Sequence, residues 1–280
     1  MSDTPVLLET ETARLPLPPR QEMRVFAVAN QKGGVGKTTT AINLGTALAQ
    51  AGQRVLLIDF DPQGNASTGL GISRQARRVT SYEVLLGGKP IAAAAVETAI
   101  PRLSVIPASV DMTGAEVELV GLERREFRLK EALDGPKPVY DYVLIDCPPS
   151  LGLLTLNALV AADAVIVPLQ CEFYALEGLS HLMRTIERVR RALNPRLNIA
   201  GVVLTMFDKR NNLSEMVASD VREHFGDKVY KTAIPRNVRL SEAPSHGLPV
   251  VTYDPKSAGA VAYGRLAGEF LKREEALSPR

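Results

Sequence analysis

Cysteine and histidine are scarce in this chain of 280 residues, and their scarcity excludes several kinds of site. The two cysteines, Cys147 and Cys171, are too few for a disulfide framework or for a four-cysteine zinc or iron–sulfur site within one chain. The three histidines are widely scattered, which argues against a metal site built from histidine.

Long apolar runs are missing too. No apolar stretch approaches the roughly 18 residues that a membrane-spanning helix needs, and the longest ones have the length of strands. The N-terminus lacks the basic start and apolar segment of a secretory signal. These absences predict a soluble, cytoplasmic protein without a membrane partner. Hydrophobic residues make up 45% of the chain, which is enough for a sizeable core.

Positive charge is unevenly distributed, although the net charge is only +2. Residues 184–240 hold 12 Lys and Arg against 6 Asp and Glu, whereas residues 1–183 hold 16 against 20. This excess predicts a surface patch for phosphate backbones. The alternative is a solvated face of no particular function.

Short apolar strands alternate with helix-length segments through most of the chain. Fully apolar strands separated by helices predict an α/β fold, in which a doubly wound, mostly parallel sheet carries helices on both faces. We expect a flexible, proline-dotted tail at 1–22, one domain at 23–273 and a short tail at 274–280. The alanine-rich segment 91–100 is interpreted as a packed helix. The expected strands are Arg24–Ala29, Arg54–Phe60, Leu103–Ile106, Tyr142–Ile145, Ala164–Pro168, Ile199–Thr205 and Val229–Ile234. The expected helices are 38–50, Met112–Leu122, Leu151–Ala161, Leu176–Leu193, Leu213–His224 and Ser257–Lys272.

A glycine-rich segment between the first strand and the first helix has the features of a phosphate-binding loop. Glycines let the backbone approach phosphate oxygens, and the N–H groups at the helix start supply positive potential. In such a loop Lys37 reaches the β- and γ-phosphates of a nucleotide, and the Thr38 hydroxyl binds Mg²⁺. The usual pattern has glycine where Gln31 stands, and a second lysine, Lys32, follows. The alternative is a glycine-rich turn that arose by chance.

Four motifs in order resemble the ParA/MinD ATPases, which carry a deviant form of the phosphate-binding loop. Lys32-Gly33-Gly34-Val35-Gly36-Lys37-Thr38-Thr39 is similar to their loop, and Asp59 to Asn65 is similar to their next motif. Asp146-Cys147-Pro148-Pro149 is similar to the third, and residues 235–244 resemble the C-terminal signature of the ParA/Soj branch. The resemblance covers 24–272 and implies a P-loop ATPase fold with ATP and Mg²⁺ as cofactors.

The resemblance also implies roles for individual residues in an ATP-sandwich dimer. Lys32 would cross the interface to the phosphates bound by the other subunit, and residues 33–39 would cradle the subunit's own nucleotide. Asp61 would orient the attacking water, with a structural Asp-Pro turn as its alternative. Asp146 would hold Mg²⁺ together with Thr38.

The resemblance also implies an adenine contact and a cellular function. Pro235 and Asn237 would lie near the adenine, although an ordinary helix-start turn would look the same. The resemblance implies a slow ATPase for DNA segregation, in which the dimer binds DNA without sequence preference at the nucleoid and a ParB-type partner stimulates hydrolysis. One alternative is a MinD-like switch on a membrane surface, which the acidic pair Glu274-Glu275 near the C-terminus disfavours, because it would be repelled by anionic lipid. Another is a relative that positions a different cargo.

Four basic residues near strand ends and turns are the candidate DNA contacts. Turns at strand ends are exposed, so their side chains can reach a phosphate backbone. The alternatives are solvated side chains or local ion pairs, in which case Arg184–Arg196 is the next candidate segment. The four residues are Lys209, Arg210, Arg236 and Arg239.

Overall fold

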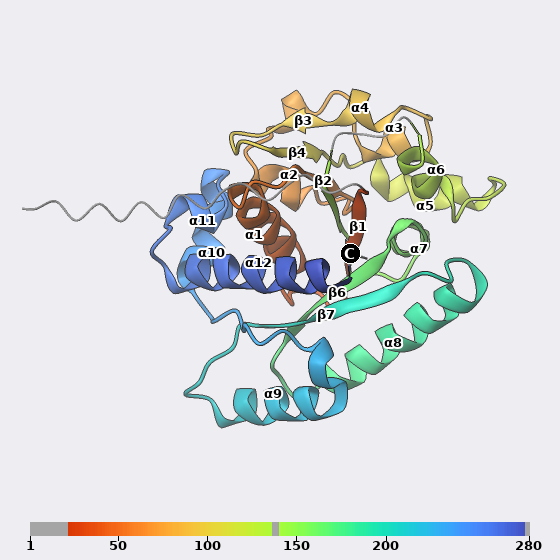
Figure 1. Cartoon of the computed structure of the whole chain (residues 1–280). Helices are drawn as coiled ribbons and strands as arrows, with labels where there is room; N and C mark the ends of the chain where they lie inside the picture. The colour runs from red at the N-terminus through yellow and green to blue at the C-terminus, as the bar shows by residue number, and fades with distance from the viewer. Residues whose placement is uncertain (1–21, 136–139, 278–280) are drawn as a thin grey trace, which may run out of the picture.

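The computed structural model describes residues 22–135 and 140–277, and it has the predicted α/β architecture with a seven-stranded sheet (Figure 1). The strands are ordered β3-β4-β2-β5-β1-β6-β7, and β3 alone is antiparallel to its neighbour. Their bounds are β1 Arg24–Val28, β2 Val55–Asp59, β3 Val96–Glu97, β4 Leu103–Ile106, β5 Tyr142–Asp146, β6 Ala164–Gln170 and β7 Asn198–Thr205.

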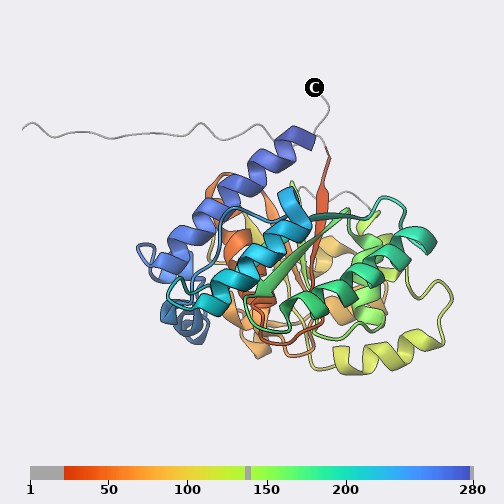
Figure 2. The same cartoon turned by 90° about the horizontal axis from the view of Figure 1, so that it is seen from below.

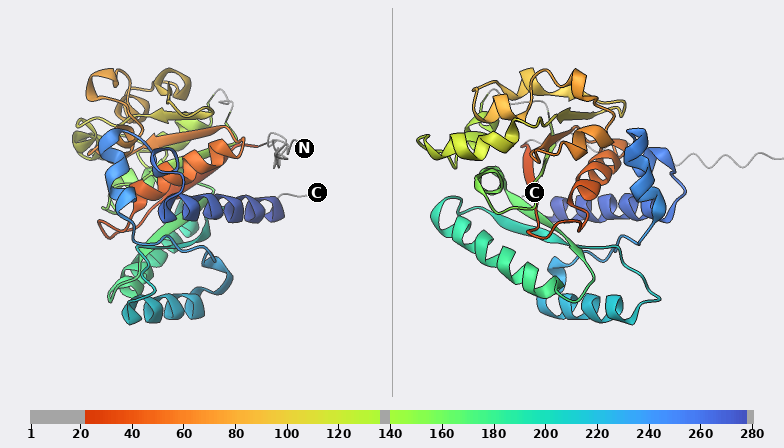
Figure 3. Two further views of the ribbon diagram at one scale, coloured as in Figure 1. Left: turned by 90° about the vertical axis from the view of Figure 1, so that its left-hand side faces the viewer. Right: turned by 180° about the vertical axis from the view of Figure 1, so that it is seen from behind.

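Helices cover both faces of the sheet, as the apolar strands require. The helices α1, α2, α11 and α12 lie on one face of the sheet and α3 to α9 on the other (Figures 1 and 3). Buried side chains of each group form the core on that face. The α-helices are α1 Lys37–Gln50, α2 Asn65–Gly69, α3 Ser81–Leu85, α4 Ile91–Ala94, α5 Met112–Val120, α6 Arg128–Leu133, α7 Leu153–Ala161, α8 Ala175–Ala192, α9 Asn212–Phe225, α10 Val238–Glu242, α11 Val250–Tyr253 and α12 Ala258–Leu277. Short 3₁₀ turns are η1 Arg74–Ala76, η2 Gly226–Lys228 and η3 Ala243–His246.

The longer helices follow from their sequence patterns. In α8 the buried residues recur every three or four positions, which gives one apolar face, and the opposite face carries charge. In α12 the aromatic ring of Phe270 packs edge-on against Phe26 and Tyr142, with centroids 4.9 and 5.3 Å apart. Figure 2 shows α12 running along one side of the molecule. This packing ties the last helix to the central strands.

The predicted strand Val229–Ile234 is wrong. Tyr230 N–H and Ile234 N–H donate to carbonyls of β7, but only isolated bridges form there. The reason is that Lys231 N–H and Thr232 N–H donate instead to the carboxylate of Glu269 on α12, at 2.8 and 3.0 Å. A side chain thus takes the place of the next backbone partner and interrupts the ladder.

Two further boundaries differ from the expectation. In the alanine-rich segment 91–100, the helix α4 ends at Ala94, and Val96 and Glu97 pair with β4 as β3. The helix α12 continues to Leu277, so 274–277 is not a tail, and Glu274 is buried there. The predicted N-terminal tail lies outside the described residues except for Glu22. In the described part of the chain, no helix is both long and apolar enough to cross a membrane.

Candidate functional site

The candidate site lies where three neighbouring parallel strands end at one edge of the sheet. The strand β5 lies between β1 and β2, and Asp146 at its end is level with Val28 on one side and with Asp59 on the other. The loop after each strand therefore starts from the same edge. This edge, outside the carboxyl ends of the strands, is where open α/β sheets place their ligands.

The loop after β1 has the backbone geometry of a phosphate cradle. Gly34 and Gly36 adopt positive φ angles of 76° and 88°, a region that other residues rarely occupy, and Gly36 directly precedes α1. The loop is fixed from β7, because the Thr205 hydroxyl donates to the carbonyl of Val35 at 2.8 Å. The loop thereby presents the start of α1 toward the strand ends, with the N–H groups of its first turn available to an anion.

The two lysines of this loop lie in different surroundings. Lys37 is buried, and its ammonium donates across the loop to the carbonyl of Lys32 at 3.0 Å. Burial lowers the pKa of Lys37, and the nearby carboxylates of Asp146 and Asp61 oppose that shift. Lys32 is instead 40% exposed, and its ammonium forms an ion pair with Glu172, which follows β6. One cation thus faces into the site, and the other faces solvent at its rim.

Asp146 and Thr38 fit a magnesium ion. Both carboxylate oxygens of Asp146 are buried, and neither has a well-formed hydrogen bond among the described residues. Burial raises the pKa of Asp146 well above its usual value, whereas the neighbouring Thr38 hydroxyl and Lys37 ammonium lower it. An unsatisfied buried carboxylate beside a hydroxyl is an oxygen donor set that suits Mg²⁺. Among the described residues, no three or more His, Cys, Asp and Glu are arranged so that they could hold a metal ion, so the remaining ligands would come from phosphate and water.

The two aspartates at the end of β2 and in the loop that follows it have different surroundings. Asp59 is fully buried and accepts hydrogen bonds from the N–H and hydroxyl of Ser67 at 2.8 and 2.6 Å, and burial raises its pKa to about 6. Asp61 is partly exposed and accepts from Gln63 N–H at 3.0 Å in a tight turn. Asp59 therefore supports the loop, and Asp61 is the carboxylate that can reach a solvent molecule.

A pocket of about 260 Å³ adjoins the phosphate loop, and it contains both residues predicted to lie near the adenine. Pro235 and Asn237 line it together with Gly36 and Thr39 of the loop. The side chain of Asn237 also begins α10, because its oxygen accepts from Arg239 N–H at 3.1 Å. The structure therefore brings these separate segments together beside the phosphate cradle.

Several further residues line this pocket that were not assigned to the nucleotide from the sequence. Four of them lie inside the C-terminal signature 235–244, including Arg236, which was predicted to contact DNA. The others come from the end of β7, from Ile234 and from α12, where no local motif marks them. Met206 has a positive φ of 51°, and the Tyr263 hydroxyl lies 3.2 Å from that of Thr40. The one sequence feature that could have indicated this part of the pocket is the predicted strand that ends just before Met206. The additional lining residues are Thr205, Met206, Ile234, Arg236, Leu240, Ser241, Pro244 and Tyr263.

The four basic residues predicted to contact DNA are all exposed, but two of them are paired locally. Arg210 forms a two-pronged ion pair with Asp208 at 2.9 and 3.0 Å, which lowers the pKa of Asp208 to about 2. Arg239 pairs with Glu242 at 2.7 Å and with Asp254 at 3.3 Å. Lys209 and Arg236 are also exposed.

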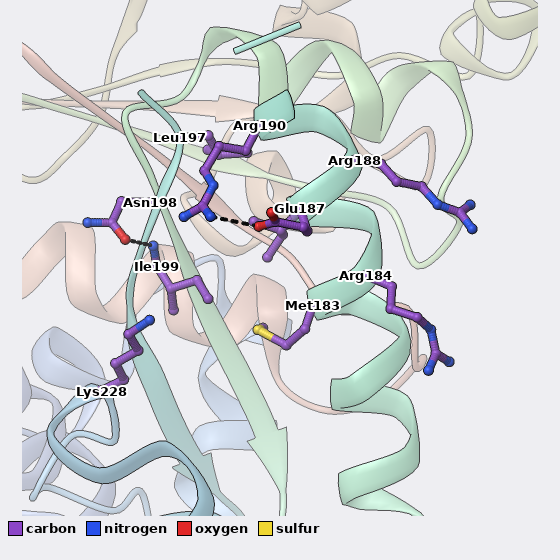
Figure 4. A pocket seen from close by; sticks show the side chains of 10 residues that line it. Met183, Arg184, Glu187, Arg188, Arg190, Leu197, Asn198, Ile199 and Lys228 are labelled. Atoms are coloured by element: carbon purple, nitrogen blue, oxygen red, sulfur yellow. Dashed lines mark hydrogen bonds and ion pairs between the residues drawn. The ribbon is translucent and has the colours of Figure 1, made fainter. Parts of the chain in front are cut away.

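A second basic surface lies in the segment Arg184–Arg196, which is the alternative candidate for DNA binding. A groove of about 540 Å³ separates α8 from β7, with Lys228 of η2 at its edge (Figure 4). Arg190 points toward the groove and pairs with Glu187 at 2.9 Å. Arg184 and Arg188 project from the outer side of α8 in Figure 4.

Comparisons with known proteins agree with this geometry. An AAA-domain family model matches residues 23–199. The chromosome partitioning protein ParA of Caulobacter vibrioides is 66% identical over 257 residues, which cover 90% of this chain and 95% of that protein. The sporulation initiation inhibitor protein Soj of Bacillus subtilis is 55% identical over 246 residues, 88% of this chain and 97% of that protein. The chain belongs to the ParA/Soj family of partitioning ATPases.

A solved structure supports the same assignment at the level of the nucleotide. A Mycobacterium smegmatis protein named cobyrinic acid a,c-diamide synthase, with bound ADP and magnesium, has a TM-score of 0.79 and 42% sequence identity. The matched region covers 91% of this chain and 96% of the Mycobacterium smegmatis chain. The predicted ParA/Soj-type family, the α/β fold, the ATPase activity and the cofactors ATP and Mg²⁺ are confirmed.

The packing of the last helix bears on the MinD-like alternative. A membrane anchor requires an apolar helix face that is free to insert. In α12 the residues Phe270 and Leu271 are buried in the core, and the buried Glu274 accepts from Arg24 of β1 at 3.2 Å. The apolar face of this helix is thus occupied by the fold itself.

Proposed function

We propose that this ParA/Soj-family ATPase binds ATP between two copies of the chain and moves DNA cargo by cycles of dimerisation and hydrolysis. The observation that carries the proposal is the different placement of the two loop lysines. Lys37 is buried at the strand ends, where it neutralises charge on the β- and γ-phosphates of its own nucleotide. Lys32 stands at the exposed rim, from which its charge reaches the nucleotide of a second copy.

The rest of the site assembles around the same nucleotide. The N–H groups of residues 33–39 hold the phosphates, and Pro235 and Asn237 contact the adenine in the adjoining pocket. Thr38 and Asp146 hold Mg²⁺, which neutralises charge that develops on the phosphates. Asp61 orients the attacking water. Hydrolysis is slow because the water and the lysine of the second copy are both in place only in a stimulated dimer.

DNA binding without sequence preference follows from dimerisation. Each copy offers a few exposed cations at the strand-end turns, which is too few for tight binding at physiological salt. A dimer doubles the contacts, and two linked weak sites gain through effective concentration. We propose that the ATP dimer binds the nucleoid in this way. A ParB-type protein that binds the centromere then stimulates hydrolysis and releases the dimer.

Binding of the purified chain to random-sequence DNA tests this proposal. We expect tight binding with ATP or a slowly hydrolysed analogue, and weak binding with ADP or without nucleotide. Addition of the ParB-type protein from the same organism should accelerate hydrolysis and release the DNA. Equal DNA affinity in all three nucleotide states would contradict the proposal, and binding to anionic vesicles in the ATP state would return the MinD-like alternative.

A further inference from the structure

The turn that carries Asp61 is held by a ring of hydrogen bonds. One member of this ring is Arg77, which lies outside the motif Asp59 to Asn65. Arg77 follows η1, and its guanidinium makes no ion pair with any described carboxylate. Its N–H groups point at backbone carbonyls and one hydroxyl. It donates to Gly64 O at 3.3 Å, to Thr68 Oγ1 at 2.8 Å and to Ala108 O at 3.1 Å.

These contacts join the loop after β2 to the loop after β4. From the Asp61 side, Gly64 N–H donates to the carbonyl of Asp61 at 2.9 Å, and Arg77 binds the carbonyl of the same Gly64. From the other side, Ala108 N–H donates to the Ser67 hydroxyl at 3.1 Å, which in turn donates to Asp59. The two sides meet at Arg77, which binds Gly64 and Ala108 at once.

The fit between Arg77 and Gly64 is close. Gly64 has a positive φ of 64°, and a Cβ built on it would lie 2.2 Å from Nη1 of Arg77. The guanidinium therefore occupies the space above this glycine. Burial lowers the pKa of Arg77, whereas the nearby Asp59 raises it. A half-buried cation whose partners are mainly carbonyls serves to fix the backbone, because five planar donors set the positions of several acceptors at once.

We propose that Arg77 is a positioning residue for ATP hydrolysis, which holds the turn of Asp61 in register by bridging Gly64 and Ala108. The inference rests on the proposed function, in which Asp61 orients the water. Arg77 does not touch the nucleotide pocket or the phosphate loop, so its loss should slow the chemical step and leave nucleotide binding intact. A shift of the turn by about 1 Å is enough to cost up to roughly a hundredfold in rate.

Single-turnover hydrolysis and nucleotide affinity measured on Arg77→Gln test the inference. We expect hydrolysis to fall by about ten- to a hundredfold, with the dissociation constant for ADP within about twofold of the wild type. Arg77→Lys keeps the charge but lacks the planar guanidinium, so its rate of hydrolysis should lie between those of the wild type and Arg77→Gln. Arg78→Gln is the matched control, because Arg78 is an exposed neighbour outside the ring, and it should hydrolyse ATP at the wild-type rate.

A double-variant cycle separates positioning from general stability. If Arg77 acts through Asp61, adding Arg77→Gln to Asp61→Ala should cause no further loss of hydrolysis. An equal additional loss in that background would overturn the inference and leave the proposed function standing. A wild-type rate in Asp61→Ala alone would overturn the inference and would reassign the water-orienting role within the proposed function. If Arg77→Gln fails to fold, amide exchange in folded Arg77→Lys decides: faster exchange at Gln63 and Gly64 alone supports the inference, and faster exchange throughout the sheet overturns it.

Discussion

Lys32 of the phosphate loop and Glu172 after β6 form an ion pair at the rim of the site. Their side chains are 40% and 35% exposed, so the pair is solvated on one side. Exposed ion pairs of this kind contribute about 1 kcal/mol or less. We therefore expect that, in the proposed dimer, the lysine exchanges its carboxylate partner for a phosphate oxygen of the nucleotide bound by the second copy.

The first prediction compares the two lysines. Lys37→Ala should abolish tight ATP binding, because it removes the buried cation that faces the phosphates. Lys32→Ala should keep much of the nucleotide affinity but lose stable ATP dimers and hydrolysis, since its charge acts on the other subunit. Glu172→Gln frees Lys32 without removing it and serves as the control that still dimerises. Titration with a fluorescent nucleotide and light scattering measure the two properties. Equal losses of monomer affinity in both lysine variants would refute the assignment.

The second prediction concerns Gly33, which follows the rim lysine. A Cβ built on Gly33 would meet no described atom within 4 Å, so a larger side chain fits within one copy. Gly33→Val should therefore bind ATP as a monomer but fail to dimerise, because the branched side chain projects toward the partner. Gly36→Val is the contrasting variant: its φ of 88° strains the loop itself, and nucleotide binding should fall. A normal ATP dimer of Gly33→Val by light scattering would be evidence against this placement.

The predictable parts of the site are those encoded in one continuous stretch. The loop from Lys32 to Thr39 follows a strand and begins a helix, so sequence order alone placed its glycines, Lys37 and Thr38. Asp146 and Asp59 each stand in a motif at the end of an apolar strand, and the structure sets them side by side because these parallel strands end at one edge. In each case the spacing along the chain determines the spacing in space.

The parts that were missed depend on contacts between distant segments. Tyr263 and Met206 reach the nucleotide pocket from α12 and from the end of β7, and neither stands in a motif. Arg77 binds Ala108, 31 residues away, through a backbone carbonyl that any residue would supply. A distant contact also explains why residues 229–234 do not form the predicted strand. The carboxylate of Glu269, which accepts from Lys231 N–H and Thr232 N–H, lies 38 and 37 residues further along the chain. A hydrogen bond between a side chain and a distant backbone group produces no periodic pattern in the sequence, so it could not be predicted.

The third prediction concerns hydrolysis. Asp61→Ala should remove the water-orienting carboxylate and leave the phosphate loop intact, because among the described residues Asp61 hydrogen-bonds only within its own turn and loop. Hydrolysis should fall by roughly a hundredfold or more, and ATP should lock the dimer on DNA. Phosphate release and native gel shifts measure the two effects. A wild-type rate would reassign the role, with Asp59 as the next carboxylate to test.

The fourth prediction concerns the thiol of Cys171, which precedes Glu172. Burial raises its pKa from 9.0 to about 11, so at pH 8 only about one molecule in a thousand carries the reactive thiolate. Alkylation by iodoacetamide should be slow in the native protein and should rise about tenfold per pH unit up to pH 10. Denatured protein, whose thiol has the lower pKa, should react far faster at pH 8. Rapid native labelling identified at Cys171 by mass spectrometry would contradict its buried position.

The last prediction concerns the surface that binds DNA. Arg210 is exposed in the turn after β7 and Arg239 in the first turn of α10, and each is held in place by an acidic neighbour. Arg210→Glu together with Arg239→Glu should weaken binding to all sequences alike, and the log–log salt slope should flatten by about one for each phosphate that is no longer neutralised. ATP binding and dimerisation should survive, because neither arginine lines the nucleotide pocket. Arg184→Glu with Arg188→Glu makes the same change of charge on α8 and is the matched comparison. If that pair alone reduces DNA affinity and salt dependence, the DNA-binding surface lies beside the α8 groove instead, and the paired arginines serve only local structure.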